Sequence, residues 1–133
     1  MGQPAAKLGD QVEAQDMHLV ILPPGSVPPT VQRPFPFKGI IDGGCSSDVK
    51  IMNKPAAVVG STASNKPPHL PPAPPESFQI PPTNMATIMK GSATVMINGK
   101  PAVRAGDTAT TCNDMLLTNT GVVVVTGSTV NIG

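Results

Sequence analysis

The sequence of 133 residues predicts a mainly β protein, a small conical structure with pseudo-threefold symmetry and long proline-rich loops. The first observation behind this prediction is a short sequence motif, called here the proline phrase, that occurs three times. Its copies start at Pro4, Pro55 and Pro101 and read PAAKLGD, PAAVVGS and PAVRAGD. Repeats at such long periods indicate supersecondary units that bury their apolar faces against one another. Three copies therefore predict three similar units around one axis.

A second phrase, rich in serine, valine and isoleucine, occupies residues 47–51, 92–97 and 127–133. Its first two copies precede a copy of the proline phrase, whereas the third ends the chain and the phrase at Pro4 has no such strand before it. We therefore expect the terminal strand to complete the first unit, so that the chain closes into a three-part ring.

Strand signals dominate elsewhere as well. Residues 122–125 are consecutive valines, and residues 94–97 precede Asn98-Gly99. This pair favours a tight hairpin turn, because both turn positions require a positive φ. Asn53-Lys54 is expected to form the equivalent turn in the middle repeat. No segment shows the apolar periodicity of a helix.

The composition indicates a narrow object and excludes several classes of protein. Hydrophobic residues make up 39% of the chain, yet only 3 are Phe and none is Trp or Tyr. The formal net charge of +1 gives no sign of the positively charged surface that nucleic-acid-binding proteins use. Apolar runs such as residues 19–22 are far too short to span a bilayer, and no signal peptide is visible. By length the chain is one domain, 1–133, which we expect to be made in the cytoplasm.

Two proline-rich segments, residues 22–37 and 66–82, interrupt the repeats. Proline favours polyproline II conformation, which loses little entropy on ordering. We expect both segments to lie as extended struts on the surface of the body or to line its contact face. Simple linkers, or docking sites for SH3-like domains, are the alternatives.

Candidate metal ligands occur at matching places in the three repeats. His18 and His69 each lie nine residues after the glycine of their repeat, and Cys112 lies six residues after the third glycine. If the repeats surround one axis, the loops that follow these glycines converge and the three side chains face a common centre. Imidazole and thiolate are ligands that tetrahedral zinc prefers. The fourth ligand is Cys45, water or nothing, and a disulfide between Cys45 and Cys112 is a further alternative.

Catalysis is not expected. The 8 acidic residues form no recognisable pair or triad. Asp10 and Asp107 recur at the ends of repeats, where capping of a turn explains them. A metal-dependent hydrolase would need an open metal position and a general base, and Asp114, close to Cys112, offers an acid beside the proposed site.

The three proline phrases and the terminal GSTVNIG strand resemble those of the PAAR-repeat family over residues 3–133. This resemblance implies a tip that caps the trimeric β-helical spike of a contractile injection machine, either a type VI secretion system or a phage-tail-like particle. It also implies one copy per trimer of a VgrG-like or gp5-like spike protein, transient contact with the target membrane, and one structural zinc ion. Relatives often carry a further histidine in the preceding proline-rich loop, but residues 30–39 contain none. The alternative function is an adaptor that recruits effector cargo through the proline-rich loops.

Overall fold

The computed structural model describes residues 2–70, 73–113 and 121–133, and all regular elements in this part of the chain are β-strands. The mainly β prediction is therefore confirmed. None of the described residues forms a helix that could cross a lipid bilayer. The strands are β1 (Gln3–Pro4), β2 (Gln11–Ile21), β3 (Thr30–Gly43), β4 (Lys50–Ile51), β5 (Lys54–Pro55), β6 (Thr62–Asn65), β7 (Ser77–Phe78), β8 (Met85–Ile88), β9 (Met96–Ile97), β10 (Lys100–Pro101), β11 (Thr108–Thr110), β12 (Gly121–Val124) and β13 (Asn131–Ile132).

The body of the protein is a closed sheet. Strands β2, β3, β6, β8, β11 and β12 pair in this order, all antiparallel, and β12 pairs back onto β2. The three hairpin-like pairs, β2–β3, β6–β8 and β11–β12, each follow one copy of the repeat phrase. Closure leaves the body without free sheet edges along its base.

The repeat phrases meet at a pseudo-threefold axis. The backbone N–H of Ala6 donates to the carbonyl of Val103 at 2.9 Å, Val103 donates to Ala57 at 3.1 Å, and Ala57 donates to Ala6 at 3.0 Å. These bonds form a ring in which each repeat gives one donor and one acceptor. The predicted arrangement of three repeats around one axis is confirmed by this ring.

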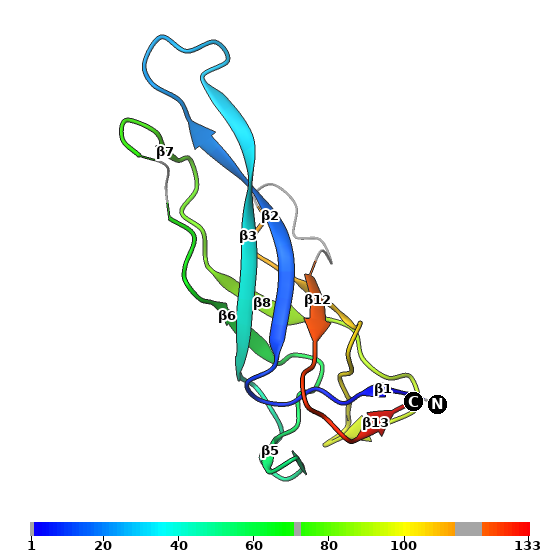
Figure 1. Cartoon of the computed structure of the whole chain (residues 1–133). Helices are drawn as coiled ribbons and strands as arrows, with labels where there is room; N and C mark the ends of the chain where they lie inside the picture. Colours follow the sequence, from blue (N-terminus) through cyan, green and yellow to red (C-terminus); the bar gives the residue numbers. More distant parts are fainter. Residues whose placement is uncertain (1, 71–72, 114–120) are drawn as a thin grey trace.

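Three small hairpins surround the broad end of the molecule. Two are β4–β5 and β9–β10, and the third is formed by the chain ends, where Gln3 pairs with Ile132. The terminal strand thus completes the first unit, as expected, and the termini lie together at this end (Figure 1). The turn at Asn98-Gly99 has the predicted positive φ at both positions, 52° and 77°.

The equivalent turn in the middle repeat lies one residue earlier than predicted. Met52 and Asn53, not Asn53 and Lys54, have positive φ, at 54° and 68°. The pairing of Ile51 with Lys54 requires this position for the turn. Asparagine alone is therefore a weaker marker of register than the Asn-Gly pair.

Small side chains fill the narrow interior in threefold sets. One cluster surrounds the axis inside the closed sheet, and a second lies beneath the three small hairpins. Each set takes one residue from each repeat, namely Ala5, Ala56 and Ala102; Ala6, Ala57 and Val103; Val12, Ala63 and Ala109; Ile41, Ile88 and Val123; and Ile51, Ile97 and Ile132. These sets contain no large ring, although Phe37 belongs to the cluster inside the closed sheet. Their small side chains agree with the narrow object that the composition predicts.

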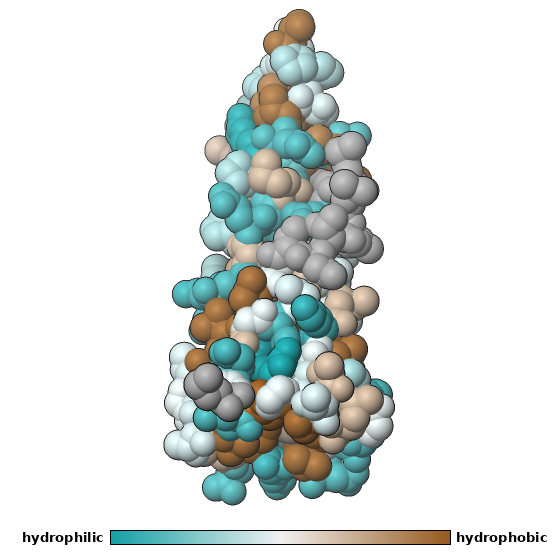
Figure 2. Space-filling view, turned by 90° about the vertical axis from the view of Figure 1, so that its right-hand side faces the viewer, coloured by the Kyte–Doolittle hydropathy of each residue, from teal (hydrophilic) through white to brown (hydrophobic). Residues whose placement is uncertain are grey.

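The first hairpin breaks the threefold symmetry because it is much longer than the others. Strands β2 and β3 contain 11 and 14 residues, whereas β6 and β8 contain 4 each. The excess length projects from the body and forms the narrow end of a tapering molecule (Figures 1 and 2).

The expected polyproline strut over residues 22–37 is wrong from Thr30 onward, because this part belongs to β3. Backbone direction explains why prolines are tolerated there. Ile41 donates its N–H toward β2, to Asp10, whereas Lys38 donates on the opposite side, to Asn65. Successive residues of a strand direct their N–H groups to opposite sides, so the even-numbered residues of β3 direct theirs away from β2. Pro34 and Pro36 occupy two of these positions. Their missing N–H groups therefore remove no hydrogen bond between β2 and β3.

The second proline-rich segment runs outward beside the long hairpin and returns to β8 (Figure 1). On the way, Phe78 and Ser77 of β7 pair with Val20 and Ile21 of β2. Strand β7 therefore lies against the part of the long hairpin that projects beyond the body.

Candidate metal centre

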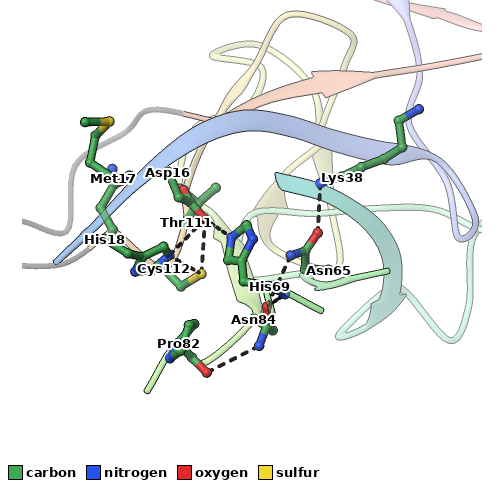
Figure 3. Close-up of polar contacts among 11 residues, drawn as sticks. Asp16, Met17, His18, Lys38, Asn65, His69, Pro82, Asn84, Thr111 and Cys112 are labelled. Carbon is green, nitrogen blue, oxygen red and sulfur yellow. Dashed lines mark hydrogen bonds and ion pairs between the residues drawn. The ribbon is translucent and has the colours of Figure 1, made fainter. Parts of the chain in front are cut away.

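Four buried side chains from three different repeats meet inside the structure, where β2 leaves the body (Figure 3). They are Asp16, His18, His69 and Cys112, and their ligand atoms all lie within 4.8 Å of one another. The structure thus brings together three of the residues that the sequence predicts as ligands. The fourth side chain of the group is Asp16, where the sequence analysis offered Cys45, water or nothing.

The strand geometry explains the position of Asp16. Asp16 and His18 both belong to β2, and residues two apart on a strand face the same side of the sheet. The expectation that His18 lies in a loop was wrong, and this error concealed the Asp-x-His pair. His69 follows β6 and Cys112 follows β11, which are the strands equivalent to β2 in the other repeats.

The carboxylate of Asp16 lies at the centre of the group. Its Oδ2 lies 2.9 Å from His69 Nε2 and 3.1 Å from Cys112 Sγ, and its Oδ1 accepts a hydrogen bond from Thr111. Sγ of Cys112 lies 3.7 Å from His18 Nε2. Zinc bonds of about 2.0–2.3 Å at tetrahedral angles place N, O and S ligand atoms about 3.3–3.6 Å apart, so small shifts of these side chains would complete a tetrahedral site.

Charge balance also fits a divalent cation. Asp16 and His18 are both 0% exposed, and in the described part of the chain no lysine or arginine forms an ion pair with Asp16. A buried carboxylate without a cation is costly. One divalent ion, one carboxylate, one thiolate and two neutral imidazoles sum to zero charge, so these residues can hold a metal ion.

Without a metal, the thiol of Cys112 is strongly held in its protonated form. Burial, together with the hydrogen bond to Asp16 and the charge of that residue, raises the pKa of Cys112 to about 12. A bound cation reverses this preference, because it favours the thiolate.

All 3 phenylalanines of the chain pack around the two histidines. The ring of Phe35 lies 5.6 Å from that of His18, and Phe37 lies 6.1 Å from His69. Phe78, carried by β7, lies 5.6 Å from His18 and 5.1 Å from Phe35. This aromatic shell keeps water from the ligands, which strengthens electrostatic interactions within the site.

A chain of amides fixes the backbone that carries His69. Oδ1 of Asn84 accepts the N–H of His69 at 2.7 Å and the side-chain amide of Asn65 at 3.1 Å. Oδ1 of Asn65 in turn accepts the N–H of Lys38 at 2.9 Å. These bonds connect the segment after β6 to strand β3, as Figure 3 shows.

Cys45 is not part of the group that surrounds Asp16. It follows the base end of β3, where Ile40 pairs with Gln11, whereas His18 pairs with Arg33 much farther along the strand. Its sulfur lies 3.8 Å from the hydroxyl of Ser61 and packs against the core. Both cysteines are free thiols, so the alternative of a Cys45–Cys112 disulfide is not realised. Asp114 lies outside the described residues.

Comparison with known protein families agrees with the repeats. The PAAR motif model matches residues 1–118 and 78–133, which together cover the whole chain. No curated protein sequence matches it significantly. The three repeats around one axis, closed by the terminal strand, are therefore those of a PAAR protein, and the chain belongs to the PAAR motif family.

Proposed function

We propose that this protein caps the trimeric β-helical spike of a contractile injection machine and sharpens it for puncturing the target envelope. Membership of the PAAR family implies a spike-tip role in secretion systems and binding to a VgrG spike. The machine would be a type VI secretion system or a phage-tail-like particle, and the whole chain would act as one domain. The protein would be made in the cytoplasm and leave the cell with the particle.

The observation that carries the proposal is the ring of backbone hydrogen bonds that joins Ala6, Ala57 and Val103 around the axis. One chain thereby presents three similar hairpins at its broad end, so a single copy matches the three chains of a spike. Exposed apolar residues in the hairpins supply the contact surface. Met96 is 61% exposed, Met52 is 45% exposed and Val130 is 41% exposed.

The opposite end supports a role in puncturing. The tip of the long hairpin contains no charged residue between His18 and Arg33. A tip without charges avoids the cost of carrying ions into hydrocarbon. Family members are structural rather than catalytic proteins, so penetration would depend on force and not on a reaction.

A single zinc ion held by Asp16, His18, His69 and Cys112 would stabilise the base of the projecting hairpin. The ion would join three repeats where the interior is too narrow for a large apolar core. Structural zinc supplies folding free energy through its ligand bonds. The fitting donor types and the charge balance support zinc.

Native mass spectrometry of the purified protein mixed with its trimeric spike tests the cap. We expect one copy per spike trimer. Met96→Asp removes an exposed apolar contact and should weaken binding about tenfold or more. Met85→Asp is the matched control, because Met85 is 46% exposed on β8, away from the broad end. Absence of a complex, or several copies per trimer, would refute the cap.

A further inference from the structure

A groove lies beside the metal centre, between strand β3 and the segment that follows β6. It has a volume of about 430 Å³. One wall contains Phe35 and Pro36 of β3, and the other contains Pro67 and Leu70. His69 also lines the groove, so its innermost part is anchored by the buried ligand cluster. This volume lies within the range of about 300–1,000 Å³ that is usual for ligand pockets.

The charges around the groove have one sign. Lys38 and Lys66 both line it and are exposed, and no carboxylate is among its lining residues. Neither ammonium group forms an ion pair within the described residues. A ligand for this groove therefore needs apolar side chains for the walls and negative charge for the two lysines.

The walls are well suited to binding without large rearrangement. Proline has little conformational freedom to lose, and Asn84 and Asn65 fix the backbone around His69. Preorganised surfaces lose less entropy when a ligand binds. The outward edge of β3 lacks N–H donors at Pro34 and Pro36, so a continuous strand cannot be added there. A peptide in the groove is therefore recognised chiefly through its side chains.

We infer that this groove binds an acidic peptide segment with adjacent apolar side chains, carried by a cargo protein. The apolar side chains lie between Pro36 and Pro67, and flanking carboxylates face Lys38 and Lys66. The cargo role depends on the proposed function, since cargo must travel with a tip. Binding of the peptide itself does not depend on it.

The test uses the full-length, zinc-loaded protein and acetylated peptides of the form Glu-X-X-Glu, with Leu or Phe at X. The neutral counterparts Gln-X-X-Gln provide the comparison. We expect submillimolar binding of an acidic peptide, at least about fivefold tighter than its neutral counterpart, as two partly exposed charge pairs allow. Amide chemical shifts in NMR spectra should change mainly around Lys38, Lys66 and Leu70.

Charge reversal provides the matched variants. Lys38→Glu and Lys66→Glu should each weaken binding of the acidic peptide about fivefold or more. Lys90→Glu makes the same change in net charge at an exposed site outside the groove and should leave binding unchanged. Equal affinity for acidic and neutral peptides, no binding, or shifts elsewhere would overturn the inference. Spike binding measured on the same variants separates this result from failure of the proposed cap.

Discussion

Asp16 and His69 are 53 residues apart in the chain, yet Oδ2 of the carboxylate lies 2.9 Å from Nε2 of the imidazole. The contact joins β2 of the first repeat to the segment after β6 in the second repeat. It is buried, and the thiol of Cys112 reaches the same oxygen from the third repeat. One carboxylate therefore connects all three units at the point where the long hairpin leaves the body.

The first prediction concerns the identity of the fourth ligand. Asp16→Asn keeps the shape of the side chain but removes the charge that balances a divalent ion. Loss of a residue that only hydrogen-bonds to a metal ligand lowers metal affinity by about 10–100-fold. Asp16 is proposed as a direct ligand, so we expect zinc affinity to fall by more than about 100-fold. Competition titration with a chromophoric chelator measures this change, and thermal unfolding should show a lower Tm.

Two controls accompany this variant. Asp42→Asn changes an exposed carboxylate in β3, and Cys45→Ser changes the thiol outside the cluster. Both should retain one zinc per chain by elemental analysis. Loss of zinc from the Cys45 variant, with retention in the Asp16 variant, would restore Cys45 as the ligand.

The second prediction is that zinc affinity increases with pH. Burial raises the pKa of Cys112 to about 12, so the metal-free thiol stays protonated and must release its proton when zinc binds. Release of one proton makes affinity rise about tenfold per pH unit between about pH 7 and 9.

Cys112→His tests this origin of the pH dependence. A neutral imidazole needs no deprotonation above its usual pKa of about 6.5, so the slope between about pH 7 and 9 should become nearly flat. An unchanged slope in this variant would assign the released proton to another group.

Internal repetition made the global arrangement predictable from the sequence. Each copy of the proline phrase supplies the same backbone donors and acceptors, so three copies can satisfy one another only around an axis. The pairing of Gln3 with Ile132 followed from the same logic, because the first and last units were each incomplete. His18, His69 and Cys112 were found because they occupy related positions after the repeats.

Asp16 and the long β3 strand were not predicted from the sequence. The prolines of residues 22–37 were interpreted as polyproline II conformation, which concealed β3 from Thr30 onward. His18 was placed in the loop expected after its repeat, which concealed its strand β2. Pro34 and Pro36 occupy alternate positions whose missing N–H groups face away from β2, which composition alone cannot reveal. With β2 recognised as a strand, the spacing of Asp16 and His18 would have put both on one face.

The third prediction tests the crowding at the axis. Ala57 is 1% exposed and lies where three repeats meet. Ala57→Leu adds volume that the hydrogen-bonded ring cannot accommodate without moving, so the free energy of unfolding should fall by about 1–3 kcal/mol. Chemical denaturation measures the change. Ala93→Leu, at an exposed position, should stay within about 0.5 kcal/mol of the parent protein.

The fourth prediction separates a passive tip from a protein that inserts into membranes by itself. Val27, at the end of the long hairpin, is 94% exposed. Its complete burial in hydrocarbon would contribute only about 1.5–2 kcal/mol. A myristoyl chain, with an association constant of about 10⁴ M⁻¹, is itself a marginal anchor. The isolated protein should therefore cause no leakage of dye from lipid vesicles at micromolar concentrations.

The same protein should nevertheless be needed when force is supplied by the machine. Particles that lack it should deliver less cargo to target cells, since the blunt spike spreads the force of contraction over a larger area. Delivery by particles with and without the protein, normalised to the number of contracted sheaths, measures this effect. Leakage caused by the isolated monomer would contradict the passive mechanism, because penetration would then need no contraction. Full delivery by particles without the protein would reject its assignment as the functional tip.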